Sequence, residues 1–86
     1  MKNEFTEEEI EKIVEFCYLG KRGTIPKTLQ SFVNDFILSM FNKNVALFTI
    51  YSQVGRDRAI SEVNPLYKPK TMEEANKEAK EMLDEN

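Results

Sequence analysis

The residue types that most often carry catalysis and metal binding are scarce in this chain of 86 residues. It has no histidine and a single cysteine, Cys17. Nucleophilic catalysis with a histidine base and zinc sites of ordinary composition both need side chains that the sequence does not supply. We therefore expect a protein that is not an enzyme and that uses no metal or cofactor. A lone cysteine also cannot form an intramolecular disulfide, which suits a reducing compartment.

Carboxylate pairs are the remaining means of acid–base or cation chemistry. Glu7 and Glu11, like Glu74 and Glu78, are four residues apart, which places each pair on one side of a helix. Both pairs adjoin helix-capping sequences, where glutamates serve the helix dipole. Because burial is what shifts a carboxylate's pKa into a catalytic range, we interpret both pairs as solvated helix surface.

The segment GKRGTIPK, residues 20–27, has the densest positive charge in the chain. Two glycines and two cations before a helix N-terminus could collect a phosphate on free amides. A P-loop, however, needs G-x-x-x-x-G-K-S/T after a strand, whereas these glycines are three apart and follow a helix. In the favoured interpretation Gly20 ends one helix, Gly23 turns the chain and Pro26 begins the next. The cations that this leaves unexplained are Lys21, Arg22 and Lys27.

Charge is segregated along the chain. Residues 1–15 and residues 72–86 each hold two lysines against six acids, for −4, whereas residues 16–71 hold eight basic residues against three acids, for +5. A fold that gathers the central cations on one side would form a basic patch. One functional hypothesis is therefore a small nucleic-acid-binding regulator whose phosphate contacts are Lys21, Arg22, Lys27, Arg56 and Arg58.

Residues 47–63 bear on the same hypothesis. They have a helical segment, a glycine turn and a short basic segment, the order found in a helix-turn-helix. The apolar positions Ile60 and Val63 do not have the expected spacing after the glycine, so we favour two packed helices with a solvated basic turn.

Capping sequences predict where the helices begin. The capping box at residues 6–9 (TEEE) predicts a helix from Glu7 that stops near Gly20. Pro26 suits the first turn of a second helix, with Thr24 as a cap upstream. This second helix has the clearest amphipathic stripe and is expected to be the core helix. Its apolar positions are Leu29, Phe32, Val33, Phe36, Ile37 and Met40.

Residues 45–54 are ambiguous, since their β-branched and aromatic content suits a strand while their apolar spacing also fits a helix. We favour a helix capped by Asn44 and ended by Gly55, followed by a short helix that Asp57 caps. The prolines of residues 64–71 predict an extended connector.

A second capping box opens the last helix, an acidic segment over 72–84 with a thin apolar side that should dock weakly. The predicted fold is all-α, a small single-domain bundle of four to five helices over residues 1–86. An α+β fold with a short hairpin around 45–63 is the alternative.

Several apolar residues fall outside the main helical stripes. The aromatic residues Phe32, Phe36 and Phe48 have helical spacing and are expected in the core. The off-stripe residues suit contact with a partner, and they are Phe16, Leu19, Leu38 and Phe41. The leading functional hypothesis is a non-catalytic protein-binding module, such as an inhibitor, adaptor or regulatory subunit, that contacts another protein or a second copy. Its Asn/Lys/Ile-rich composition is compatible with a bacterial or phage origin.

The length and hydropathy of the chain limit which ligands and which cellular location are expected. A chain this short hides only about 60% of its surface on folding, so no large cavity for a small-molecule substrate is expected. The acidic N-terminal segment does not fit a secretory signal. The longest apolar stretch, 36–51, is interrupted by polar residues at 42–44 and is too short for a membrane span. A cytoplasmic protein without membrane contact is therefore expected.

Overall fold

Four α-helices and no β-strand make up residues 4–84, the part of the chain that the computed structural model describes. The helices are α1 (Glu7–Arg22), α2 (Lys27–Lys43), α3 (Val45–Val63) and α4 (Met72–Asp84). The all-α prediction is confirmed. The hairpin alternative and the fifth helix are wrong, because residues 45–63 form one continuous helix. Residues 1–3 and 85–86 of the predicted domain lie outside the described residues.

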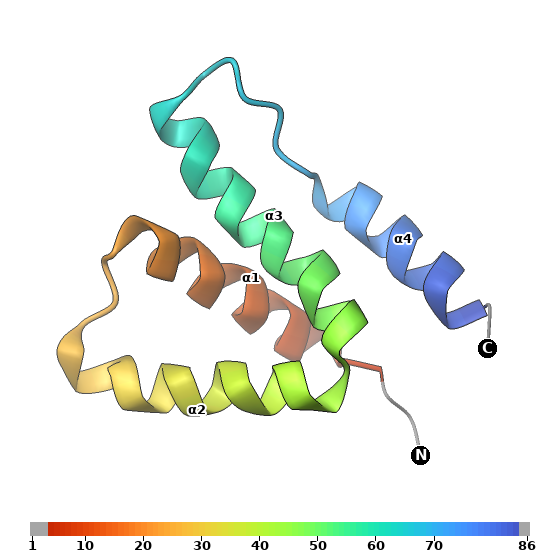
Figure 1. Cartoon of the computed structure of the whole chain (residues 1–86), viewed down its shortest axis with the longest axis horizontal. Helices are drawn as coiled ribbons and strands as arrows, with labels where there is room; N and C mark the ends of the chain where they lie inside the picture. The colour runs from red at the N-terminus through yellow and green to blue at the C-terminus, as the bar shows by residue number, and fades with distance from the viewer. Residues whose placement is uncertain (1–3, 85–86) are drawn as a thin grey trace.

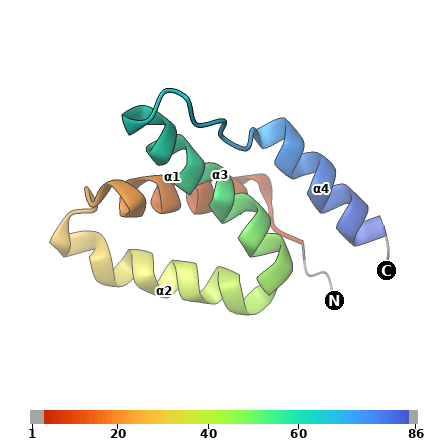
Figure 2. The ribbon, with the colours of Figure 1, turned by 45° about the horizontal axis from the view of Figure 1, so that its top comes forward.

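The helices are arranged around one crossing. α1 and α3 share by far the most extensive contact, and α2 and α4 lie on opposite sides of this pair (Figures 1 and 2). The resulting molecule is flat, with extents of 36 × 33 × 17 Å. Its apolar core lies between α1 and α3, with contributions from the inward sides of α2 and α4. The buried core residues are Phe5, Ile13, Val14, Met40, Leu47, Phe48, Tyr51, Val54, Ala75 and Ala79.

The ends of α1 follow from local sequence, although one end lies further on than predicted. The backbone N–H of Thr6 donates to Glu9 Oε1 at 2.8 Å, and the N–H of Glu9 donates to Thr6 Oγ1 at 3.1 Å, which confirms the capping box. The predicted stop near Gly20 is wrong. Gly23 instead takes the left-handed conformation, with φ of 72°, and its N–H donates to the Gly20 carbonyl at 3.1 Å.

The connection to α2 is short and structural. Pro26 was predicted in the first turn of the helix but directly precedes it, in an extended conformation with φ of −58° and ψ of 141°. Thr24 does not cap α2, because its hydroxyl donates back to the Leu19 carbonyl at 3.4 Å. The glycine and proline of this loop thus end one helix and begin the next.

Gly55 lies within α3, so the prediction that it ends a helix is wrong. A Cβ built on Gly55 would lie 2.9 Å from the backbone nitrogen of Tyr18, 3.1 Å from Cys17 Cβ and closer still to the Val14 carbonyl oxygen. The glycine is therefore where the backbones of α1 and α3 approach each other. The predicted cap at the start of α3 is confirmed, since Asn44 Oδ1 accepts from the Leu47 N–H at 3.0 Å.

The second helix is not the core helix. Its inward side was identified correctly, because Val33 and Met40 are buried and Phe36 is half-buried. Leu29 and Phe32, however, are 52% and 59% exposed, so the prediction of Phe32 as core is wrong, whereas Phe48 is buried as predicted. The physical reason is that α2 contacts α1 and α3 much less than those two helices contact each other.

Asp57 holds the connector 64–71 onto α3. The prediction that Asp57 caps a short helix is wrong. Its side chain is 5% exposed and accepts from the Tyr67 hydroxyl at 2.9 Å, from the Lys70 N–H at 2.9 Å and from the Gln53 amide. Desolvation acts to raise the pKa of Asp57, but these hydrogen bonds and the Lys70 charge outweigh it, so the pKa is lowered.

The last helix then packs on α3 through small residues. Ala75 is fully buried and Ala79 is 5% exposed. The capping box at its start is confirmed, because the Glu74 N–H donates to Thr71 Oγ1 at 3.1 Å and the Thr71 N–H donates to Glu74 Oε1 at 3.3 Å. The two alanines let α4 approach α3 closely although its apolar side is narrow.

Candidate protein-binding surfaces

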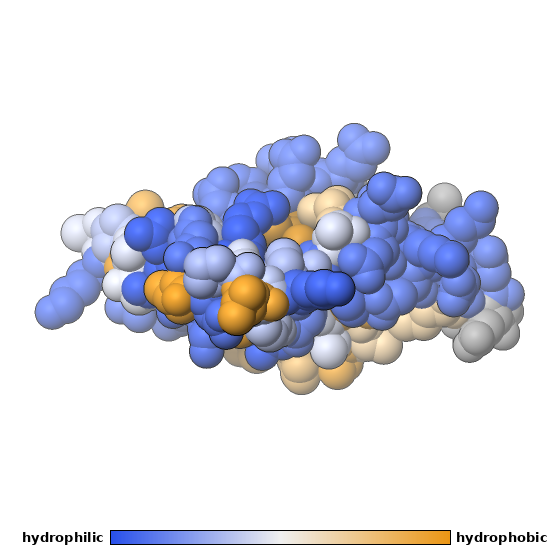
Figure 3. Space-filling model, turned by 90° about the horizontal axis from the view of Figure 1, so that it is seen from above, coloured by the Kyte–Doolittle hydropathy of each residue, from blue (hydrophilic) through white to orange (hydrophobic). Residues whose placement is uncertain are grey.

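The four residues predicted to bind a partner do not form one surface. Phe16 packs against α2, whereas Leu38 and Phe41 lie on a different side of α2, and Leu19 is near Tyr18 and Arg58 in a shallow hollow of α1. On the face shown in Figure 3, apolar residues also occur as separate groups among hydrophilic ones. The apolar residues predicted to bind a partner therefore lie in at least two separate regions of the surface.

The first region is an aromatic cluster, which we define as Phe16, Phe32 and Phe36. The Phe16 ring meets Phe36 at a centroid distance of 5.5 Å and Phe32 at 6.4 Å, both edge to face. Such pairs contribute about 0.5–1.5 kcal/mol beyond the area they bury. Because Phe16 holds one edge of Phe32 while more than half of that side chain stays exposed, the cluster presents an ordered aromatic surface to solvent.

Leu29 extends this aromatic surface toward the α1–α2 loop. It lies three residues before Phe32 on the same helix and is 52% exposed. Both residues were missed as partner-binding candidates because they fit the helical stripe so well that the pattern assigned them to the core. The sequence shows a long stripe of six large apolar residues, but only the structure shows that few neighbours cover it.

The second region follows α2 to its junction with α3. Leu38 is 58% exposed, Phe41 is 40% exposed and Val45, which begins α3, is 50% exposed. The Phe41 ring packs edge to face on buried Phe48, with 5.7 Å between centroids. Phe41 is thus anchored by the core on one side and open to solvent on the other, as a contact residue for a second molecule would be.

The basic residues of the alternative hypothesis are partly engaged within the chain. Arg22 Nε lies 3.6 Å from Glu62 Oε1, and its guanidinium donates to the Tyr18 hydroxyl at 3.0 Å. Arg58 also lies over the Tyr18 ring, 5.8 Å from its centroid. The Tyr18 hydroxyl in turn donates to Glu62. Arg22, Arg58 and Glu62 thus surround Tyr18. The Glu62 carboxylate offsets part of the positive charge of the two arginines.

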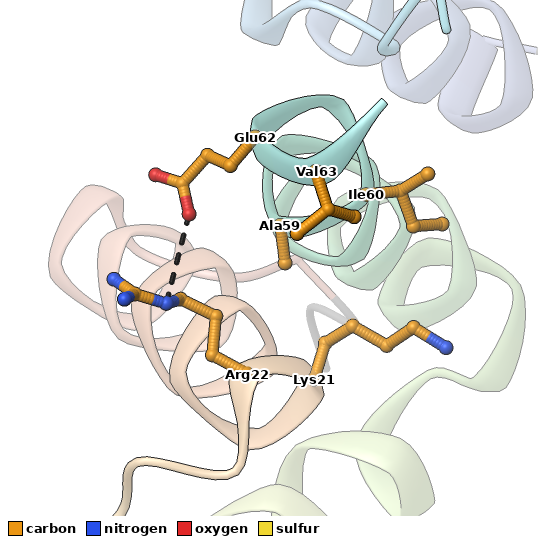
Figure 4. A pocket seen from close by; sticks show the side chains of 6 residues that line it. All are labelled: Lys21, Arg22, Ala59, Ile60, Glu62 and Val63. Carbon is orange, nitrogen blue, oxygen red and sulfur yellow. Dashed lines mark ion pairs between the residues drawn. The ribbon is translucent and has the colours of Figure 1, made fainter. Parts of the chain in front are cut away.

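The other cations of that hypothesis point elsewhere. Figure 4 shows Arg22 extending toward Glu62 while Lys21 extends away from it, along a shallow hollow lined by Ala59, Ile60 and Val63. Arg56 donates to Gln53 at 3.0 Å, and Lys27 is exposed at the start of α2. The contacts of these residues do not unite all five predicted cations in one phosphate-binding surface.

The acidic residues and Cys17 are the side chains that could bind a metal or take part in acid–base or nucleophilic chemistry. No group of three acidic or cysteine side chains in that range is placed to hold a metal ion. The predicted carboxylate pairs are exposed, and Glu78 forms an ion pair with Lys70 at 2.9 Å. Burial raises the pKa of Cys17 to about 11 although the Arg56 charge acts to lower it, so its thiol is a poor nucleophile at neutral pH.

The function is narrowed neither by a membrane-spanning helix nor by similarity to a known protein. Within residues 4–84, none of the helices combines the length and apolarity needed to cross a lipid bilayer. Comparisons of the chain with protein-family models, with curated proteins and with solved structures found no match.

Proposed function

We propose that this chain is a non-catalytic binding protein that acts through contacts with another protein, as an inhibitor, adaptor or regulatory module. The observation that supports this most is the exposed aromatic surface of Phe32 and Leu29, held in place by Phe16. Aromatic side chains that are ordered before binding lose little entropy on association, and they are enriched among the residues that carry binding energy.

The surroundings indicate what kind of partner fits. The cluster joins α1 to α2, and three cations flank the loop between these helices, since Lys21 and Arg22 end α1 and Lys27 begins α2. A partner segment with an apolar side chain to pack on Phe32 and acidic residues beside it would complement both features. The acidic helix α4 lies across the molecule from this region.

Affinity capture with matched variants tests the proposal. Tagged wild-type protein, Phe32→Asp and Leu66→Asp would be used to capture proteins from the native cell. Leu66 is the control because it is 91% exposed and equally apolar but lies in the connector, far along the chain from the cluster. We expect a protein that is retained by wild type and by Leu66→Asp and lost by Phe32→Asp, whose helicity is unchanged. Equal capture by all three forms would overturn the proposal.

The nucleic-acid hypothesis has weaker support and remains a prediction. Its five cations are divided between Tyr18, Glu62, Gln53 and open solvent. Duplex DNA binding measured at two salt concentrations tests it, because phosphate contacts weaken steeply with salt. The absence of binding at low salt would exclude this function.

A further inference from the structure

We propose that the groove between α1 and α4 binds a basic amphipathic helix of a partner protein. Two adjoining hollows form this groove, with volumes of about 490 and 210 Å³, and they share Glu11 and Met72. One wall of the groove is the side of α1 that runs from Glu7 to Leu19, and the other wall is Met72 and Asn76 at the start of α4.

The floor of the groove is apolar. The groove is open because α1 and α4 each pack on α3, while their own backbones do not come close to each other (Figures 1 and 2). Ile10, Val14 and Met72 line it and belong to the core or pack against it. Leu19, which the sequence predicted as a partner-binding residue, also lines it. A metal ion or a small polyamine would leave this floor uncovered, whereas an amphipathic helix covers it with its apolar side.

Three carboxylates follow the α1 wall of the groove. Glu7, Glu11 and Glu15 are exposed and are four residues apart, which keeps them on one side of the helix. Within residues 4–84 none of the three forms an ion pair, whereas three other glutamates pair with cations of the chain. Lysines or arginines at four-residue steps on a partner helix would lie opposite this row.

The cations near the groove limit where the basic residues of the partner can lie. Arg58 lines the hollow that does not include Glu7, so the groove is acidic toward Glu7 and has a positive charge toward its other end. Lys12 is about 100° further around α1 than Glu11, and Lys80 is one turn beyond the α4 wall, and neither lines the groove. The partner helix should therefore be basic along the glutamate row and not beside Arg58.

A helix fits the groove better than an extended peptide does. Residues 4–84 contain no β-strand, so they offer no sheet edge with which an extended main chain could pair. The α1 wall spans about 18 Å from Glu7 to Leu19, the length of roughly 12 helical residues. A helix laid along this wall places an apolar side chain on the floor and a cation near the carboxylates at each turn.

Fluorescence anisotropy with two synthetic peptides tests the inference. The probe is a fluorescein-labelled leucine–lysine peptide of about 14 residues whose leucines follow helical spacing. Its control has the same composition in strict alternation, the pattern of a strand. We expect the wild-type protein to bind the helical peptide at least about tenfold more tightly than the alternating one, since both carry the same charge but only the first matches the groove.

Matched charge reversals locate the binding site. Glu11→Lys, at the carboxylate shared by both hollows, should raise the Kd of the helical peptide about 30-fold. Glu81→Lys makes the same change of charge at an exposed residue of α4 that does not line the groove, and it should raise the Kd no more than about threefold. If Glu11→Lys lost its helicity, Glu11→Gln would decide, with an expected increase of about fivefold.

Three results would overturn the inference. They are the absence of peptide binding at low salt, equal affinity for the two peptides, and equal effects of Glu11→Lys and Glu81→Lys. The groove goes beyond the proposed function, because Phe32 and the rest of α2 do not line it. Phe32→Asp should therefore leave the peptide Kd unchanged, and peptide binding that Phe32→Asp abolishes would also refute the groove. A protein that binds the helical peptide in the groove but whose captured partners ignore Phe32→Asp would refute only the proposed function.

Discussion

Replacing Gly55 by alanine tests the helix crossing on which the fold depends. Alanine is a better helix former than glycine by about 1 kcal/mol, so in an open helix this change would stabilise the protein. At the crossing, however, the new Cβ would lie 2.9 Å from the Tyr18 nitrogen and 3.1 Å from Cys17 Cβ, and closer still to the Val14 carbonyl oxygen. Two of these three atoms belong to the backbone, so no side-chain rotation relieves the contact.

The size of the effect follows from this geometry. α1 and α3 would have to separate by about 1 Å along the most extensive contact in the molecule, and overpacking of this kind costs about 1–3 kcal/mol. We expect Gly55→Ala to lose about 2 kcal/mol net of the helix-propensity gain. For a domain of this size, that lowers the Tm by roughly 10 °C.

Two other glycines provide matched controls for urea and thermal unfolding. Gly20 lies inside α1, and a Cβ there would meet only Ile25 Cδ1, at 3.7 Å. Gly20→Ala should therefore stabilise the protein by about 0.5–1 kcal/mol. Gly23 has a φ of 72°, so Gly23→Ala should destabilise it by about 1 kcal/mol without any steric contact. A Gly55→Ala variant at least as stable as the wild type would refute the close crossing and restore the interpretation of Gly55 as a helix end.

The remaining predictions concern Asp57 and Cys17. The folded-state pKa of Asp57 is lowered from 3.8. Its contribution to the free energy of unfolding is therefore present above that pH and is lost as the pH falls through the lower folded pKa. Asp57→Asn should therefore unfold more easily than wild type by about 2 kcal/mol at pH 7, with the difference shrinking below about pH 4; a difference independent of pH would contradict the role of the charge. Burial raises the pKa of Cys17 from 9.0 to about 11, so a thiol reagent at pH 8 should label the native protein about 100-fold more slowly than the urea-unfolded chain. Equal labelling rates would show that the thiol is open to solvent.

Three of the caps predicted from neighbouring residues were confirmed, whereas those predicted at Thr24 and Asp57 were wrong. The capping boxes at Thr6 and Thr71 and the cap at Asn44 each need only a side chain and a backbone amide three positions away, so the local sequence is sufficient to specify them. The choice of Gly20 over Gly23 as the stop of α1 was wrong because both are glycine, and only the conformation of the chain distinguishes the one with positive φ.

The candidate surfaces could be predicted only in part. Phe16, Leu38 and Phe41 were identified as off-stripe residues, but nothing in the sequence could show that Phe16 and Leu38 lie in different regions. Phe32 was assigned to the core because an amphipathic pattern reveals which side of a helix faces inward. It does not reveal how much of that side the rest of the protein covers.

The sequence by itself therefore determined the helical class and most helix ends, because capping and periodicity act over a few residues. The tertiary structure alone decided that Gly55 continues α3, that Asp57 anchors the connector and that α2 remains largely uncovered. Each of these depends on which distant segment lies alongside. Gly55 is fixed by α1, Asp57 by residues 67–70, and the exposure of α2 by how little of α1 and α3 reaches it.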